Sequence, residues 1–475
     1  MDKKMQVIIK MIPVLVCMFM PLVVPAPAGL DVATWHVVGV FLSLLFALVL
    51  KPFNEAVGSL IVLGLGTLVV DSPATLYQGF ANETVWFICS VLLACSAFQR
   101  TGLGKRIAYF LLRKLSKTPF AHSVIGLGYM EMLVDLVLSP ATGSNTPRSA
   151  IVFGVFSGIA DSLGSTPKHE PRKIGAYLEL LEHVVTMATA VLFLTGQASN
   201  SVIASTIYEM TGIELTWGLW FQCACVPAIV ILLLSPVIVY LIYPPQMRRL
   251  EGVDDLIKQA TAEMGPISDR EKKLLGLFVF AILGWTVGAG LGISTNAVGF
   301  IFLALVLLLG VLDWNDLMAE KGAWSMLVWC GAFFGVIAAL SAGGFHEWLA
   351  TQMASVLDLS HVNEWLIIAV LVLISFLLKY FFVSNATHVA TIYPVIFTLA
   401  STTGVNTMVL ALFLAYFGGY GCLLNNYGNG ASIYLYSNGY VSMKDWFVRG
   451  TAILLVIIVI FTAFALPWWK FLGIW

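Results

Sequence analysis

Long apolar runs separated by short polar connections dominate this 475-residue chain. Many of the runs approach the roughly 20 apolar residues that an α-helix needs to cross a bilayer. They lack the alternation of polar and apolar residues that is typical of a transmembrane barrel. We therefore predict an all-α polytopic membrane protein with about 11 membrane segments. The uninterrupted spans are predicted at 11–28, 34–50, 55–70, 82–99, 217–243, 273–293, 296–312, 323–342 and 444–467.

Two further regions contain paired apolar runs joined by a polar break. Residues 120–160 break at PATGSNTP, where two Pro and one Gly would end a helix. Residues 363–403 break at a second Ser-Asn pair. The pairs Ser144-Asn145 and Ser384-Asn385 lie 384 − 144 = 240 positions apart, about half of the chain. We predict two re-entrant helical hairpins with these pairs at their tips.

A long segment with a polar centre follows each hairpin. Residues 174–211 contain TGQASNS at 195–201, and residues 406–437 contain LNNYGNGAS at 424–432. Each segment is too long for one span, so we predict two half-helices joined by an unwound segment. A hairpin followed by a broken helix, once per half, is the layout of an inverted-repeat carrier. Sequence similarity between the halves is slight, so this prediction depends on the arrangement.

The charged segment 246–272 is the predicted linker between a first half, 1–245, and a second half, 273–475. Basic residues cluster in 100–117, in 248–273 and near the N-terminus, and the positive-inside rule assigns such segments to the cytoplasm. This places the N-terminus and the first hairpin on the cytoplasmic side, and the second hairpin and the C-terminus on the external side. We interpret 100–117 as a determinant of topology and not as a nucleic-acid or lipid site.

Composition supports a multi-pass protein of the inner or plasma membrane. Hydrophobic residues make up 59% of the chain and charged residues 11%, and the mean hydropathy is +0.91. A soluble domain could not bury so much apolar surface with so few charges. The first 29 residues resemble a signal peptide. With many spans downstream, an uncleaved first helix is the preferred interpretation, and cleavage stays open.

The hairpin tips carry residues that suit an anion. The first N–H groups of a helix lack intrahelical partners and lie at the positive end of its dipole. Ser, Asn and Thr side chains can cap such a helix or donate to a carboxylate. The repeated Ser-Asn pair, with Thr146 and Thr387 close behind, favours binding over capping alone. Two facing tips would attract a dianion.

An ionisable residue lies four positions after each Ser: Arg148 in the first copy and His388 in the second. Such residues are costly in a membrane and are candidates for function. We expect them to supply counter-charge, although His388 could be a neutral core histidine. The seven Cys lie in apolar segments, and no HExxH or GxSxG occurs. We therefore expect no metal, cofactor or enzymatic activity, and a membrane-embedded enzyme remains a remote alternative.

The stretch DLVLSPATGSNTPR (135–148) resembles a motif of the divalent anion/sodium symporter family, closest to its bacterial citrate/succinate and tartrate/succinate antiporters. The resemblance continues through ASNSVIA (198–204), FVSNATH (382–388), residues 425–441 and PWWKFLGIW (467–475). It implies a homodimer in which a transport domain moves against a static scaffold, as in an elevator. The substrate site would be Ser144, Asn145, Thr146, Ser384, Asn385 and Thr387, with Gly196, Asn429 and Gly430 at the unwound joints.

Three departures from the family pattern affect the expected coupling. The second tip reads Ser-Asn-Ala, the last joint reads Asn429-Gly430-Ala431-Ser432, and Pro140 and Tyr380 replace hydroxyl residues four positions before each Ser. We expect sodium-independent exchange of di- or tricarboxylates such as citrate, succinate, tartrate, malate or 2-oxoglutarate. The alternative is a sodium-coupled symporter. Its ligands would come from Ser144, Asn145, Gly196 and Asn385.

Overall fold

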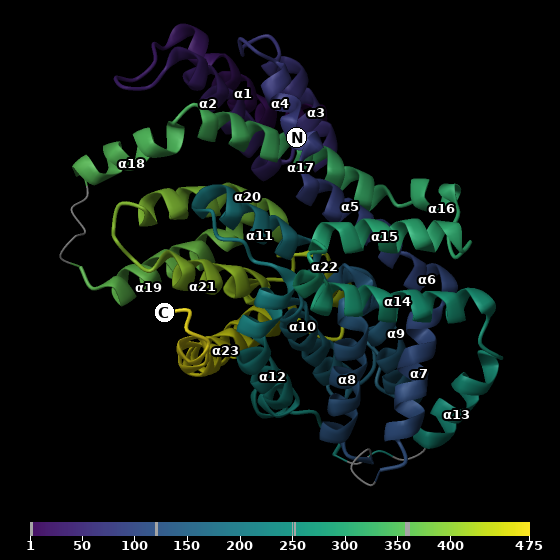
Figure 1. Cartoon of the computed structure of the whole chain (residues 1–475). Helices are drawn as coiled ribbons and strands as arrows, with labels where there is room; N and C mark the ends of the chain where they lie inside the picture. The colour runs from purple at the N-terminus through teal and green to yellow at the C-terminus, as the bar shows by residue number, and fades with distance from the viewer. Residues whose placement is uncertain (1–2, 119–121, 249, 251–252, 357–361) are drawn as a thin grey trace.

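A computed structural model describes residues 3–118, 122–248, 250, 253–356 and 362–475, and in these ranges the regular elements are helices (Figure 1). Apart from one isolated bridge between Thr166 and His169, the described residues form no β-structure. Ten of the described helices are long and apolar enough to cross a membrane. The predicted all-α membrane fold is confirmed.

One group of helices, which we call the outer block, lies along the upper and right-hand sides of Figure 1. Helix α17 crosses the chain at η1 so closely that a Cβ on Gly79 would lie 2.1 Å from the Gly331 carbonyl oxygen. Helix α1 packs along α2, where the Ser43 hydroxyl donates to the Val14 carbonyl at 2.8 Å. The block contains α1 (Lys3–Val23), α2 (Val32–Leu50), α3 (Glu55–Gly66), α4 (Ala74–Tyr77), η1 (Gln78–Ala81), α5 (Glu83–Cys95), α14 (Asp269–Val287), η4 (Gly288–Leu291), α15 (Thr295–Leu308), α16 (Trp314–Met318) and α17 (Lys321–Ala342).

The remaining long helices form an inner block around α10, whose 18 residues are all buried. From the first half come α8 (Val124–Thr142), α9 (Asn145–Ser162), α10 (Gly175–Leu192), η3 (Leu194–Gly196), α11 (Ala198–Thr211) and α12 (Trp217–Ile242). From the second half come α19 (Glu364–Leu378), η5 (Lys379–Phe381), α20 (Asn385–Ala400), α21 (Thr407–Tyr420), η6 (Gly421–Leu424), α22 (Gly430–Asn438) and α23 (Met443–Phe471). The two hairpins and the two broken helices that the sequence predicts are thus all present in this block.

The two halves interlock inside the inner block. The second helix of each hairpin packs on the helix that follows the unwound joint of the other half: α9 on α22, and α20 on α11. Helices α10 and α12 likewise pack on their counterparts α21 and α23. Each joint is therefore assembled with a hairpin from the opposite half of the chain.

Two predicted spans are shorter in the structure than expected. Helix α3 has 12 residues and α15 has 14, in place of spans over 55–70 and 296–312. Both helices start within one residue of the prediction, after the caps Asn54 and Ser294, but α3 ends at Gly66 and α15 at Leu308, two residues before the left-handed Gly310. Neither helix reaches the roughly 20 residues that cross a bilayer alone.

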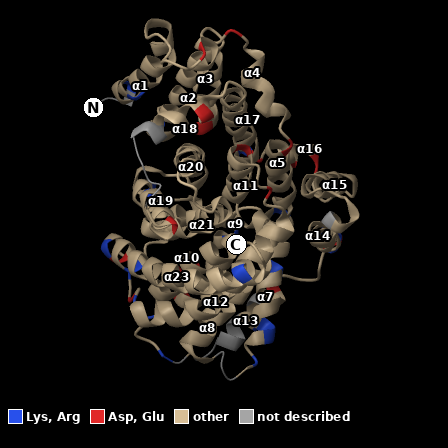
Figure 2. Ribbon diagram, turned by 60° about the vertical axis from the view of Figure 1, so that its left-hand side comes forward, with Lys and Arg blue, Asp and Glu red and all other residues tan. Residues whose placement is uncertain are grey.

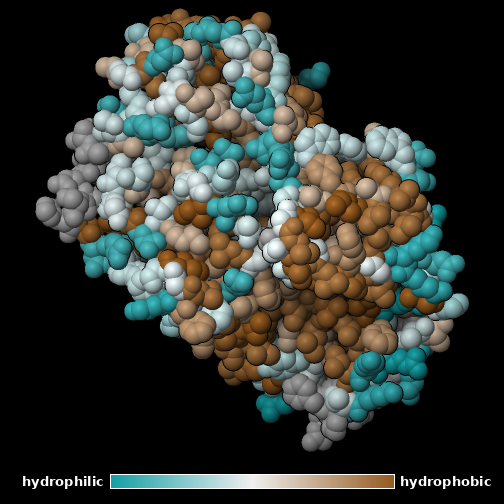
Figure 3. Space-filling model, viewed as in Figure 1, coloured by the Kyte–Doolittle hydropathy of each residue, from teal (hydrophilic) through white to brown (hydrophobic). Residues whose placement is uncertain are grey.

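Four helices connect the blocks: α6 (Ala97–Thr101), α7 (Leu103–Leu115), α13 (Val253–Glu263) and α18 (Phe345–Val356). Helix α13, from the predicted linker, packs on the basic helix α7. Arg106 of α7 donates to Glu271 at 2.6 Å. Figure 2 shows Lys and Arg gathered at the end of the molecule that holds α7, α8 and α13. Figure 3 shows an apolar surface over α14 and α15, between more polar ends.

Candidate functional site

The first hairpin tip consists of a sharp turn and the start of α9. Gly143 adopts φ +61°, a left-handed conformation that glycine adopts without strain, and ends α8. Ser144 has extended backbone before α9, but its side chain makes no capping bond. Ser144 and Thr146 line a cavity of about 510 Å³ together with Ala198 of α11 and side chains of α5 and α17. The hydroxyl of Ser144 is therefore placed at a cavity between the two blocks.

The tip is tied to the first unwound joint through amide side chains. The Asn145 amide donates to Gln197 Oε1 at 3.2 Å, and Gln197 donates to Asn200 at 2.8 Å. Asn200 in turn donates to the carbonyls of Ala190 and Phe193 at 2.6 and 2.9 Å. These carbonyls lie at the end of α10, where helical bonding stops, so Asn200 satisfies acceptors that the break would leave unpaired.

Thr146 reaches the second joint as well. A Cβ on Gly430 would lie 2.2 Å from Thr146 Oγ1, so only glycine allows this approach without a shift of either segment. Asn429, just before it, caps α22 by accepting from the Ser432 N–H at 2.8 Å. The first tip thus contacts both unwound joints.

The second tip has a similar backbone and different side-chain bonds. Ser384 precedes α20, and its hydroxyl accepts from the Thr387 N–H at 3.4 Å. The Asn385 amide donates to Ser199 Oγ at 2.9 Å. Because Gln197 contacts the first tip and Ser199 the second, the two tips converge on the same three-residue stretch of the first joint.

A residue that the sequence analysis overlooked lies at this second tip. The Lys379 ammonium group donates to Asn385 Oδ1, and Lys379 is 1% exposed. No carboxylate of the described residues lies within ion-pair distance of it. The signal was available in the sequence, because Lys379 is a cation inside an apolar run five positions before Ser384.

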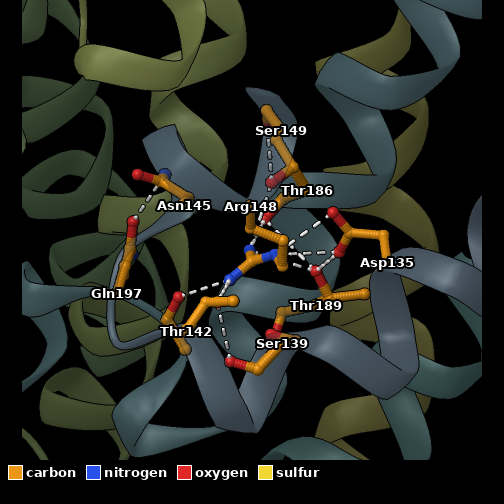
Figure 4. A network of polar contacts seen from close by, with 10 residues as sticks. Asp135, Ser139, Thr142, Asn145, Arg148, Ser149, Thr186, Thr189 and Gln197 are labelled. Carbon is orange, nitrogen blue, oxygen red and sulfur yellow. Dashed lines mark hydrogen bonds and ion pairs between the residues drawn. The ribbon is translucent and has the colours of Figure 1, made fainter. Parts of the chain in front are cut away.

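Arg148 requires a correction, because it is not an unpaired counter-charge. Its Nε lies 3.1 Å from both carboxylate oxygens of Asp135, and both side chains are fully buried (Figure 4). The guanidinium also donates to the Gly196 carbonyl at 2.7 Å and to the Thr186 carbonyl at 2.9 Å. Asp135 neutralises its charge, and the hydrogen bonds tie α8, α9, α10 and the first joint together. Asp135 belongs to the conspicuous 135–148 stretch, but the sequence did not reveal its partner.

His388 lies beside Lys379 in the second hairpin and is also buried. Its Nε2 lies 3.0 Å from the Ser375 carbonyl, which can only accept, so Nε2 carries the hydrogen. The ring contacts Phe382 and Tyr393 edge-on. A second positive charge next to Lys379 would be unfavourable, and these contacts suit a neutral histidine. The cationic side chain at the second tip is therefore Lys379, and His388 does not have the role that the sequence predicted for it.

Two oxygens that would be sodium ligands under the alternative hypothesis are already engaged by cationic side chains. The Gly196 carbonyl accepts from Arg148, and Asn385 Oδ1 accepts from Lys379. In the described part of the chain, no group of three or more His, Cys, Asp or Glu residues could hold a metal ion. The hydroxyls and amides of the two tips are thus gathered beside two buried cationic side chains.

Comparison with known proteins gives consistent results. The family described as "Sodium:sulfate symporter transmembrane region" matches residues 4–475. The chain is 35% identical over 460 residues to "Inner membrane protein YbhI" of Escherichia coli (strain K12), covering 95% of each protein. It is 29% identical over 471 residues to an "L-tartrate/succinate antiporter" of Shigella boydii serotype 4 (strain Sb227), covering 94% of each.

A solved structure shares the fold at low sequence identity. The YdaH transporter of Alcanivorax borkumensis superposes with a TM-score of 0.53 at 13% identity, covering 98% of each chain. The match over nearly the whole chain, together with the helical membrane fold, leads to one conclusion. This protein is a multi-pass membrane protein that belongs to the sodium:sulfate symporter family of transporters, the divalent anion/sodium symporters.

Proposed function

We propose that this protein exchanges small di- or tricarboxylate anions across the inner or plasma membrane without sodium. The observation that carries this proposal is the engagement of the Gly196 carbonyl and Asn385 Oδ1 by Arg148 and Lys379. A sodium ion bound to these oxygens would lie next to a buried guanidinium and a buried ammonium, and the like charges would repel it. The relative named as a tartrate/succinate antiporter supports both the substrate class and the exchange mode.

The substrate would bind where the two tips converge. The unpaired N–H groups at the starts of α9 and α20, with the positive ends of their dipoles, would receive carboxylate groups. Ser144, Asn145 and Thr146 would hold one end of the anion, and Ser384, Asn385 and Thr387 the other. Gly430 would border the site through its close approach to Thr146, and Asn429 would do so as the residue just before it. Lys379 would supply a positive charge that stays in place when the substrate leaves.

Transport would follow from movement of the inner block against the outer block. A cavity of about 510 Å³ at the first tip and another of about 400 Å³ beside α11 both lie between the blocks. A weak contact of 3.5 Å between Asn82 and Glu209 joins the two blocks near the second cavity. These spaces leave room for an elevator-type displacement, which we expect to take place in a homodimer. The basic helix α7 and the linker helix α13 would face the cytoplasm, as would the N-terminus with Lys4 and Lys10, and the C-terminus would lie outside.

A built-in cation explains why the cycle would be an exchange. With no substrate, the site would carry the uncompensated charge of Lys379, and moving a charged empty site through the membrane is costly. With a dianion bound, this charge is offset. The carrier would therefore return only when it is loaded.

Counterflow in proteoliposomes tests this proposal. Vesicles preloaded with succinate should take up labelled succinate, tartrate or citrate, and a sodium gradient should not change the rate. Empty vesicles should take up little, as should protein-free liposomes, which report leak. Accumulation in empty vesicles that requires inward sodium would instead establish the symporter alternative.

A further inference from the structure

Behind the first tip, the inner block holds an excess of buried acid. Glu131 and Asp135 on α8, and Glu182 on α10, are each 0% exposed. The one cation among them is Arg148 on α9, also 0% exposed. Three carboxyl groups and one guanidinium cannot all be ionised here without leaving two uncompensated negative charges in the interior.

The hydrogen bonds show which acids lack compensation. Asp135 accepts from Arg148 through both oxygens and also from the Thr189 hydroxyl, so this pair is satisfied. The four carboxyl oxygens of Glu131 and Glu182 have no hydrogen-bond donor among the described residues. A buried carboxylate with neither a cation nor a hydrogen-bond donor is so costly that the group takes up a proton instead. Lys379 differs from the two glutamates, because its ammonium group has an acceptor in Asn385 Oδ1. We therefore expect both glutamates to be protonated.

The two glutamates differ in their neighbours. Glu182 lies one helical turn before Thr186 on α10, and the carbonyl and hydroxyl of Thr186 both accept from Arg148. Glu131 lies one helical turn before Asp135 on α8, the acid that is paired with Arg148. Loss of a proton from Glu182 would place a new negative charge next to a guanidinium, whereas at Glu131 it would place the charge next to another acid.

Other titratable groups lie on α10 and on the helices packed against it. On α10 itself, His183 bonds to Ser432, and the buried Glu179 accepts from the Val441 N–H. Asp161 on α9 is exposed and accepts from the Tyr440 hydroxyl. The groups that are uncharged at neutral pH are Tyr129 on α8, Tyr177 on α10, Cys223, Cys225 and Tyr240 on α12, Tyr416 and Tyr420 on α21, Cys422 on η6 and Tyr434 on α22. Arg148 is the only Lys or Arg on these described helices.

We propose that Glu182 is a proton-binding site whose proton is released to water and regained during the transport cycle. The ionised carboxylate would compete with Asp135 for Arg148. Because Arg148 also donates to the Gly196 carbonyl and to the Thr142 hydroxyl, a change of its partner would alter the support of the first tip. This inference deepens the proposed function and rests on it: the exchange of carboxylates would be linked to a proton.

Infrared difference spectroscopy of the full-length protein tests the site without requiring transport. The C=O stretch of a protonated carboxylic acid should change when pH or tartrate concentration changes, and Glu182→Gln should abolish that change. Glu131→Gln is the matched control, since it removes a buried acid without a guanidinium neighbour, and the change should remain. If the acid band in the wild type is insensitive to pH and substrate, Glu182 is a permanently neutral structural group and the inference fails.

Transport provides a second, separable measurement. Tartrate/tartrate exchange, with a substrate that stays fully ionised from mildly acidic to mildly alkaline pH, should vary several-fold over that range. The Glu131→Gln protein should show the same profile, and Glu182→Gln should give a flat one. Wild-type exchange that does not vary with pH overturns the proton site and leaves the proposed function intact. An absence of any carboxylate exchange contradicts the proposed function itself, while the infrared result still decides the proton site.

Discussion

The two hairpin tips share a Ser-Asn motif, but the buried cation near the first tip is paired with an acid and the one near the second tip is not. Arg148 behind the first tip is paired with Asp135 and hydrogen-bonded to the first joint. Lys379 at the second tip donates to Asn385 and has no carboxylate partner in the described part of the chain. A repeated motif therefore does not imply repeated electrostatics. We expect the first cation to determine stability and the second to determine exchange.

The largest effect should come from breaking the first tip's ion pair. Arg148→Met leaves the Asp135 carboxylate buried and unpaired, which should lower the free energy of unfolding by about 3–5 kcal/mol. Thermal unfolding of the purified protein, followed by tryptophan fluorescence, measures this loss. The double variant Arg148→Met/Asp135→Leu should regain most of the stability, because no uncompensated charge remains. A single variant as stable as the wild type would show that the pair is dispensable.

Replacing Lys379, the cation at the second tip, should affect transport more than stability. Lys379→Met removes a buried charge that has no counter-ion but leaves Asn385 Oδ1 without its donor, so the free energy of unfolding should fall by about 1–3 kcal/mol at most, less than in Arg148→Met. Counterflow should fall at least about tenfold, equivalent to ~1.4 kcal/mol in the barrier. Lys379→Arg, which keeps the charge, should retain part of the activity. If Lys379→Met exchanges at the wild-type rate, or unfolds as readily as Arg148→Met, the contrast between the tips is wrong.

The smallest effect should come from the contact between the first tip and the second joint. In Gly430→Ala, the new methyl group would lie 2.2 Å from Thr146 Oγ1. Relieving this overlap should cost about 1–3 kcal/mol and weaken substrate binding. Adding Thr146→Ala removes the clashing hydroxyl and should restore stability, although not full affinity. Unfolding and tartrate binding of both variants can be measured by calorimetry, and an unaffected Gly430→Ala protein would contradict the close approach.

Much of the fold could be predicted because apolar length and helix-breaking residues act locally. The polar breaks at Ser144 and Ser384 identified both hairpins, and 195–201 and 424–432 identified both joints. The predicted ends of the spans 55–70 and 296–312 were wrong, because α3 ends at Gly66 and α15 ends two residues before the left-handed Gly310, although both runs remain apolar. Hydropathy records which segments are apolar, but it does not fix where a helix starts or ends.

The electrostatics of the site could not be predicted from spacing. Asp135 lies 148 − 135 = 13 positions before Arg148, on the other helix of the hairpin, and only the fold of the hairpin brings them together. Lys379 stands five positions before Ser384 and outside the motif, whereas its neighbour Tyr380 occupies the motif position four before that Ser, so the motif alone did not point to Lys379. A search for every charged residue inside the apolar segments would have found both Lys379 and Asp135. It would not have shown that Arg148 is neutralised by an acid and that Lys379 is not.

The contact between Thr146 and Gly430 also constrains biosynthesis. The two residues are 430 − 146 = 284 positions apart, so most of the chain is synthesised between them. The first hairpin is synthesised early, but its contact with α22 can form only after α22 has been made, and such long-range contacts form slowly. Until then, the polar residues of the first tip lack their final partners in a partly inserted chain. A mutation near the end of the gene would therefore damage the part of the binding site that is encoded in its first third.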